Sequence, residues 1–155
     1  MKKILIALDF DSSAHKIAEI GYALAAAMKA EVILLHVTSE ASYYSSFNYS
    51  PITGFGIFSN EDLVEKDTVV ELKKIAINFL KNIQKSFDER NTYLVVENGR
   101  CAENILMVSS ESGVDMIVMG THGRGGLKKM LLGSVAEEVL HHSSIPLLII
   151  PVKNI

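Results

Sequence analysis

Five apolar runs alternate with amphipathic segments along the chain. A continuous apolar run of about four to eight residues is consistent with a strand buried on both faces. The predicted strands are Lys2–Asp9, Glu31–Thr38, Tyr93–Glu97, Asp115–Gly120 and Ile145–Val152. Apolar residues at helical spacing predict helices between them, over 13–29, from Asn60 or Glu61 to Phe87, from Ala102 to near Gly113, and over Ser134–His142.

This alternation indicates the fold class. Strands that alternate with helices form a parallel sheet with helices on both faces, and its crossovers are right-handed. The chain has 155 residues, of which 48% are hydrophobic, so it is long enough to bury one sizeable core. The sequence contains no internal repeat and no domain boundary. We therefore expect residues 1–155 to form a single α/β domain.

Residues 39–60 interrupt the pattern with Ser, Asn, Gly and Pro. The segment also contains the aromatic residues Tyr43, Tyr44, Phe47, Tyr49, Phe55 and Phe58. A loop of this length is usually functional or disordered. We expect its aromatic side chains to cover the domain or a partner subunit, with contact to a ligand as the alternative.

Charge, cysteine content and the first residues narrow the classes of protein. The net charge is −3 without a block of like charges, which argues against non-specific nucleic-acid binding, because that requires a basic face. No apolar run is long enough to span a bilayer. Asp9 and Asp11 end the first run and no small-residue cleavage pattern follows, so we expect a strand there and a cytoplasmic protein. Cys101 is the lone cysteine, which fits a reducing compartment, and we expect it to be buried or capping rather than nucleophilic.

The segment from Gly120 to Val135 is the main candidate for chemistry. Glycines stand at positions 120, 123, 125, 126 and 133. Glycine permits positive φ and close approach of a ligand, and successive amides in such a turn can bind an anion. Gly133 and Ser134 then open a helix, whose free N–H groups and dipole favour negative charge. Because Ser134 and Glu137 have the spacing of a capping box, the alternative is a set of tight turns in which Ser134 only caps its helix.

Two common nucleotide motifs do not match. A P-loop that starts at Gly120 would need a lysine where Gly126 stands. A Rossmann fingerprint would follow the first strand, but Asp9–Ser13 contains no glycine. The chain is therefore predicted to be neither a P-loop NTPase nor a standard dinucleotide-binding protein.

The spacing of three glycines carries a resemblance to a known family. Gly120-x2-Gly123-x9-Gly133-Ser134 resembles the ATP-binding signature of the universal stress protein family. The surrounding DMIVMGTHGRGGLKKMLLGSVAEEVLHHSSIPLLIIPV, the opening ILIALDFDSS and the strand VILLHV are also similar to the family. The likeness covers essentially all 155 residues and is weakest over 39–60. A complete set of signature glycines implies the ATP-binding class of the family.

The resemblance implies a doubly wound five-stranded parallel sheet in the order 3-2-1-4-5, of the adenine nucleotide alpha hydrolase-like type. The winding direction would change between the first and fourth strands, and ligands of open α/β sheets bind at the carboxyl ends of strands at such a switch. Asp9 would then lie beside Gly120. The last strand would be an apolar edge, so we expect a homodimer through Ile145 to Val152, as the family also implies.

The family pattern further implies which positions hold ATP. On the nucleoside side these are Ala7, Leu8, Asp9, Val37, Met119 and Gly120, and on the phosphate side His122, Gly123, Arg124, Gly133, Ser134 and Val135. Asp9 would contact the adenosine and the backbone of Val37 the adenine, while Met119 and Gly120 would line the ribose. His122 and Arg124 would either assist the phosphates or remain solvated loop side chains.

The sequence favours a binding module over an enzyme. ATP hydrolysis needs a positioned water or base, and usually a metal with charge neutralisation. The chain has no Walker-type acid, and Asp9 and Asp11 are assigned to the nucleoside and to the start of a helix. Mg²⁺ would arrive on the phosphates. The histidines lack metal-ligand spacing, since His36 is expected in the core and His141-His142 are adjacent near a helix end. A nucleotide-dependent regulatory or stress-response module is therefore preferred, with a slow ATPase or nucleotidyl-transfer enzyme as the alternative.

Overall fold

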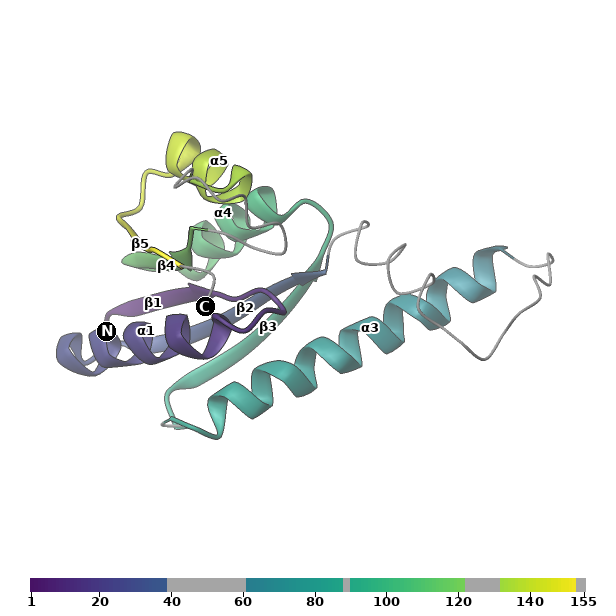
Figure 1. The fold of residues 1–155 in the computed structure, drawn as a ribbon, viewed down its shortest axis with the longest axis horizontal. Coiled ribbons are helices and arrows are strands. Elements are labelled where there is room, and N and C mark those ends of the chain that lie inside the picture. Colours follow the sequence, from purple (N-terminus) through teal and green to yellow (C-terminus); the bar gives the residue numbers. More distant parts are fainter. Residues whose placement is uncertain (39–60, 88–89, 122–131, 153–155) are drawn as a thin grey trace.

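The computed structural model describes residues 1–38, 61–87, 90–121 and 132–152 (Figure 1). Its strands are β1 (Lys3–Ala7), β2 (Glu31–Thr38), β3 (Thr92–Asn98), β4 (Met116–Gly120) and β5 (Leu147–Ile150). Its helices are α1 (Ala14–Met28), α3 (Glu61–Gln84), α4 (Cys101–Ser112) and α5 (Ser134–His142). The predicted strands and helices are all present, with ends that differ by a few residues. The aromatic loop 39–60 lies outside the described residues.

The strands form one parallel sheet in the order β3-β2-β1-β4-β5, which confirms the predicted order. β1 lies in the middle, where Leu5 is paired with Ile33 of β2 and with Ile117 of β4. β5 forms one edge of the sheet and β3 the other. The winding direction therefore changes between β1 and β4, which is where open α/β sheets bind their ligands.

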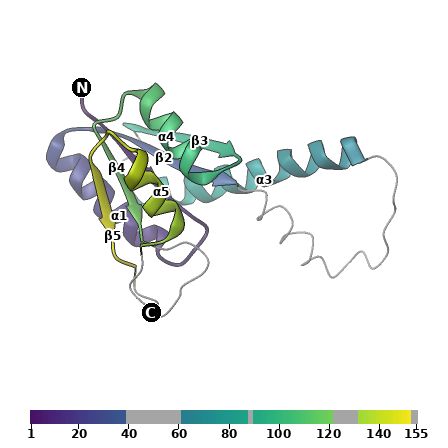
Figure 2. The ribbon, with the colours of Figure 1, turned by 90° about the horizontal axis from the view of Figure 1, so that it is seen from above.

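Helices cover both faces of the sheet. α1 and α3 lie on one face, and α4 and α5 lie on the other (Figure 1, Figure 2). Successive residues of β1 divide between the two, because side chains of a strand alternate: Ile4 and Ile6 face α1 and α3, whereas Leu5 faces α4 and α5. We refer to the two buried clusters as the α1–α3 face and the α4–α5 face. None of the helices in the described ranges combines the length and apolarity needed to cross a membrane.

Three strands are shorter than predicted, and β4 loses only its first residue, Asp115. β1 ends at Ala7 rather than Asp9 because the chain turns there, with the Asp11 amide donating to the Asp9 carbonyl at 2.9 Å. β5 covers only Leu147–Ile150, since it is bracketed by Pro146 and Pro151, which have no amide to donate to a neighbouring strand. Leu8 and Asp9 consequently follow the end of the central strand.

The structure identifies the N-cap residues of α1 and α5. α1 follows Ser13, but Ser13 makes no capping hydrogen bond, and its amide donates to the Asp11 carboxylate at 2.6 Å. The N-cap of α5 is Gly133, in an extended conformation with φ −60° and ψ 153°, and the helix has no side-chain cap. The capping box of Ser134 and Glu137 is therefore wrong, because Ser134 is already the first helical residue.

Candidate functional site

The candidate site lies at the carboxyl edge of the sheet, where β1 and β4 separate. Their pairing runs from Ile4 with Met116 to Ile6 with Val118. The start of α5 is held at the same edge, because the Gly133 amide donates to the Thr121 carbonyl at 2.6 Å. The residues that follow β1, end β4 and open α5 therefore converge on one side of the molecule.

Beyond the end of β1, the edge of β2 offers a peptide group to this site. Within the described residues, backbone hydrogen bonding between the two strands ends with the bond from the Leu8 amide to the Leu35 carbonyl, at 2.9 Å. Alternate peptide groups of a strand point to the same side. The amide and carbonyl of Val37 consequently point toward β1, but β1 ends before it lies opposite them. This arrangement suits recognition of a planar ring edge with one donor and one acceptor.

Four of the predicted site residues share one apolar cluster. Ala7, Val37, Met119 and Val135 all belong to the α4–α5 face. Leu8 lies on the opposite α1–α3 face, 4% exposed. At the carboxyl edge, the side chains on the α4–α5 face are therefore those of Ala7, Val37 on β2 and Met119 on β4.

Gly120 has a structural reason to be glycine. A Cβ atom at this position would lie 2.7 Å from Cδ1 of Ile17 and 3.1 Å from Cγ2 of Val152. Both neighbours belong to the α1–α3 face. A side chain at position 120 would therefore collide with α1 and with the segment after β5, on the face of the sheet away from α4 and α5.

The two acids after β1 are held differently. One carboxylate oxygen of Asp9 accepts the amide of Phe10 at 2.8 Å, and Asp9 is half-buried. The Asp11 carboxylate turns back to accept both the amide and the hydroxyl of Ser13. Asp11 thus organises the turn into α1, as predicted, and Asp9 is the acid beside the separating strands.

The first turn of α5 presents unused donors. Its first helical hydrogen bond runs from the Glu137 amide to the Gly133 carbonyl, at 2.9 Å. The amides of Ser134, Val135 and Ala136 precede that bond and have no helical partner. They lie at the positive end of the helix dipole, which favours an anion. His122, Gly123 and Arg124 lie outside the described residues, so their predicted roles remain predictions.

Cys101 is a neighbour of the site, which its sequence context does not reveal. It is the first residue of α4, is half-buried, and packs against the α4–α5 face together with Ala7 and Val135. Burial raises the pKa of its thiol, and the negative charge of Asp9 raises it further. The predicted sheet order does contain a signal for the position of Cys101. The turn from β3 into α4 lies at the carboxyl edge, as does the turn after β1.

The histidines that the structure describes have separate roles. His36 is 3% exposed, and its Nδ1 donates to the Leu8 carbonyl at 2.8 Å, which confirms it as a satisfied core residue. Nδ1 of His142 donates to the Glu138 carbonyl within α5. In the part of the chain that the structure describes, no three His, Cys, Asp or Glu side chains are grouped to hold a metal ion.

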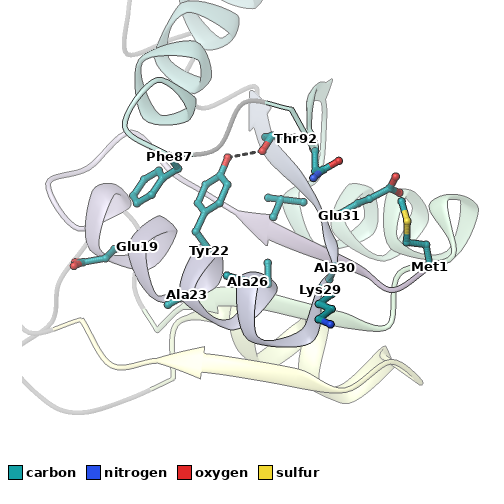
Figure 3. A pocket seen from close by; sticks show the side chains of 13 residues that line it. Met1, Glu19, Tyr22, Ala23, Ala26, Lys29, Ala30, Glu31, Phe87 and Thr92 are labelled. Carbon is teal, nitrogen blue, oxygen red and sulfur yellow. Dashed lines mark hydrogen bonds between the residues drawn. The ribbon is translucent and has the colours of Figure 1, made fainter.

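A cavity of about 570 Å³ lies at the other end of the sheet, where β2 and β3 begin (Figure 3). Ala26 and Ala30 form part of its lining. On its wall the Tyr22 ring stacks on Phe87, and the Tyr22 hydroxyl is hydrogen-bonded to Thr92 at 3.0 Å. The cavity therefore lies across the sheet from the carboxyl edge, and its wall includes an aromatic pair tied to the start of β3.

A family model and individual relatives identify the same protein family for this chain. The sequence model of the universal stress protein family matches residues 1–151. Universal stress protein MJ0577 of Methanocaldococcus jannaschii is 33% identical over 156 residues, which cover 99% of this chain and 96% of the relative. Universal stress protein YxiE of Bacillus subtilis is 33% identical over 150 residues, covering 96% and 97% of the two chains.

Solved structures are similar along nearly the whole chain. The structure of MJ0577 has a TM-score of 0.78 at 32% identity and covers 99% of this chain and 97% of its own. A universal stress protein in complex with cAMP has a TM-score of 0.63 at 15% identity, with 97% and 96% covered. The second likeness shows the shared fold alone.

Proposed function

Because the chain belongs to the universal stress protein family, we propose that it is an ATP-binding module whose nucleotide occupancy regulates a stress-response interaction. The observation that carries this proposal is the convergence of two sets of backbone groups at one edge of the sheet. The Val37 peptide group lies beyond the end of β1, and the unused amides of Ser134 and Val135 open α5. The first set suits an adenine edge and the second suits phosphates.

The proposal gives each part of the site one task. Asp9, half-buried at the end of the central strand, binds ribose hydroxyls, and a carboxylate is the acceptor such hydroxyls need. Ser134 is the first helical residue rather than the N-cap, and its hydroxyl joins the amides in binding phosphate. Mg²⁺ travels with the phosphates, since it is usually bound through substrate phosphates rather than in a cage of protein ligands.

A calorimetric titration of the full chain with ATP and Mg²⁺ tests the proposal. Asp9→Asn is expected to weaken binding about 10- to 100-fold, because a hydrogen bond to a charged group is lost. Asp11→Asn is the matched control, since it makes the same change two residues away in a carboxylate that serves the turn into α1. Affinity within about two-fold of the parent is expected for that control. Absence of heat at saturating ATP would refute ATP binding.

A single-turnover assay separates a regulatory module from the alternative of a slow ATPase or nucleotidyl-transfer enzyme. Backbone amides and one carboxylate bind the nucleotide without positioning a water for attack. Hydrolysis at about 1 s⁻¹ or faster that disappears in Asp9→Ala would overturn the regulatory interpretation.

The partner proposed for this site is a second copy of the chain, paired through β5. The Pro146 carbonyl accepts the Ile117 amide at 2.9 Å, and the Ile150 carbonyl accepts the Thr121 amide at 3.0 Å. Because successive residues of a strand point to opposite sides, the amides and carbonyls of the odd-numbered residues between them point to the open edge. Ile149→Pro removes one outward amide and leaves the bonds to β4. We expect the parent to elute as a dimer in light scattering at micromolar concentration and this variant to shift toward the monomer. A monomeric parent would contradict pairing through β5.

A further inference from the structure

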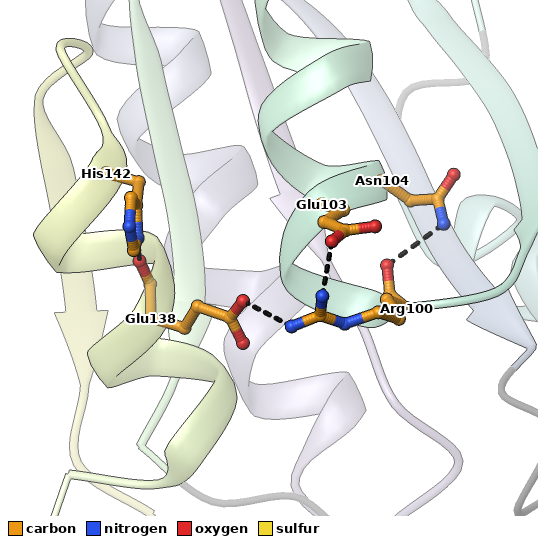
Figure 4. Close-up of polar contacts among 5 residues, drawn as sticks. All are labelled: Arg100, Glu103, Asn104, Glu138 and His142. Carbon is orange, nitrogen blue, oxygen red and sulfur yellow. Dashed lines mark hydrogen bonds and ion pairs between the residues drawn. The ribbon is translucent and has the colours of Figure 1, made fainter.

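One arginine joins the two helices that begin at the candidate site. Arg100 is the N-cap residue of α4, directly before Cys101. Its Nη2 donates to Oε1 of Glu138 on α5 at 2.9 Å, and its Nη1 donates to Oε1 of Glu103 on α4 (Figure 4). We call these three residues the Arg100 clamp. The clamp adds a polar link between two helices that also pack on the α4–α5 face.

The packing beneath the clamp is apolar and gives α5 little directional restraint. α5 has nine residues, of which Ala136 and Val139 are buried, and both belong to the α4–α5 face. The hydrophobic effect is non-directional, so these contacts set the position of such a short helix less sharply than a hydrogen bond does. A guanidinium between two carboxylates is directional, because its donors lie in a fixed plane.

The first turn of α5 is thus held from two sides. On the β4 side, the Gly133 amide is bonded to the Thr121 carbonyl at 2.6 Å. On the α4 side, Glu138 lies one helical turn after Ser134 and is held by Arg100. Glu103 holds the same guanidinium from within α4, which fixes where Glu138 can be bound.

We propose that Arg100 is a positioning residue that sets the place of the Ser134 and Val135 amides for phosphate. This inference rests on the proposed function, because it concerns the phosphate side of that site. Arg100 acts through Glu138 and α5. It therefore differs from the residues assigned to nucleotide contact.

Two substitutions separate positioning from charge. Arg100→Gln removes a positive charge near the phosphates, and Glu138→Gln removes a negative one. If charge alone mattered, the first would weaken ATP binding and the second would strengthen it. A positioning role predicts that each substitution weakens ATP binding about two- to five-fold, which is the effect expected of one exposed ion pair. It also predicts that the double variant binds ATP no more weakly than Arg100→Gln. Binding of adenosine, which lacks phosphates, should stay unchanged in all three variants.

Glu137→Gln is the matched control, since it removes the same charge from the same helix at a residue outside the clamp. It should bind ATP as the parent does or slightly more tightly. Stronger ATP binding by Glu138→Gln, or equal loss for ATP and adenosine in Arg100→Gln, would overturn the proposal.

Hydrogen exchange of the nucleotide-free protein gives a readout independent of ATP. The amides of Glu137 and Val139 should exchange about two- to five-fold faster in Arg100→Gln than in the parent, whereas those of β1 should not change. Unchanged exchange in α5 would refute the positioning role. If the parent binds neither ATP nor adenosine while exchange in α5 rises as expected, the clamp stands and the proposed function fails.

Discussion

Replacing Gly120 by alanine tests whether this glycine is required by packing. The added Cβ would lie 2.7 Å from Cδ1 of Ile17, closer than real Cβ atoms approach another carbon. Ile17 is 4% exposed, so its side chain has little room to move away. Inserting a methyl group into a packed core costs about 1–3 kcal/mol. In a domain of this length that lowers Tm by about 2–12 °C.

The variant Ile17→Val provides the internal control. It removes the Cδ1 atom, after which the closest atoms to the new Cβ are Cγ2 of Val152 at 3.1 Å and Cγ1 of residue 17 at 3.6 Å. Ile17→Val alone should cost about 0.5–1.5 kcal/mol. In the double variant the methyl group added at position 120 occupies the released space. Its loss of stability should therefore be smaller than the sum of the single losses, by about 1–2 kcal/mol.

Urea unfolding of the parent, the two single variants and the double variant measures this coupling. Additive losses would refute the reasoning, because they would mean that Ile17 does not provide the steric limit at position 120. Nucleotide affinity of the double variant adds a functional readout. If packing against α1 is the main reason for the glycine, the double variant should bind ATP within about two-fold of the parent.

Three further predictions follow from single residues. The raised pKa of Cys101 means that less of its thiolate is present at pH 8. Alkylation of Cys101 by iodoacetamide should therefore be slower than alkylation of free cysteine, and it should be faster in Asp9→Asn than in the parent. Bound nucleotide should slow the same reaction, and equal rates in Asp9→Asn and the parent would contradict the proximity of the two residues. Ser109 is fully buried, and its hydroxyl has no partner among the described residues, so Ser109→Ala should unfold at the same or a slightly higher urea concentration, with a gain of about 1 kcal/mol or less. Lys29 caps the C-terminus of α1 with φ 51°, a conformation that glycine adopts without strain. Lys29→Gly should therefore raise the free energy of unfolding by about 0.5–1 kcal/mol. A lower Tm would show that the Lys29 side chain matters more than its backbone.

Sequence pattern was sufficient for the sheet but only in part for the site. Apolar runs and helical spacing located each described strand and helix, because burial on two faces leaves a clear pattern. The order of the strands came from the resemblance, since periodicity says nothing about which strands are neighbours. Residue-level detail was lost at the strand ends: Leu8 and Asp9 were predicted in β1, but the turn at Asp9 ends the strand at Ala7.

The errors at the site have local physical causes. Ser134 matched a capping box by spacing, yet the extended conformation of Gly133 makes that residue the cap. Cys101 is predicted to be buried or capping, and the sequence does not show its proximity to Asp9, because that arises from two turns that are far apart in the sequence. The joining of α4 to α5 by Arg100 was also invisible, since an exposed arginine has no pattern of its own.

The polarity of a parallel sheet has a practical consequence for this protein. Met1 precedes β1 and is 89% exposed, so it lies at the amino edge, across the sheet from the carboxyl edge where Asp9 and Ser134 converge. A fluorophore or fused tag attached there would leave the carboxyl edge unobstructed. If the proposed nucleotide binding is confirmed, a sensor built on this scaffold is best attached through the residues before β1, with the environment-sensitive dye placed separately on α5.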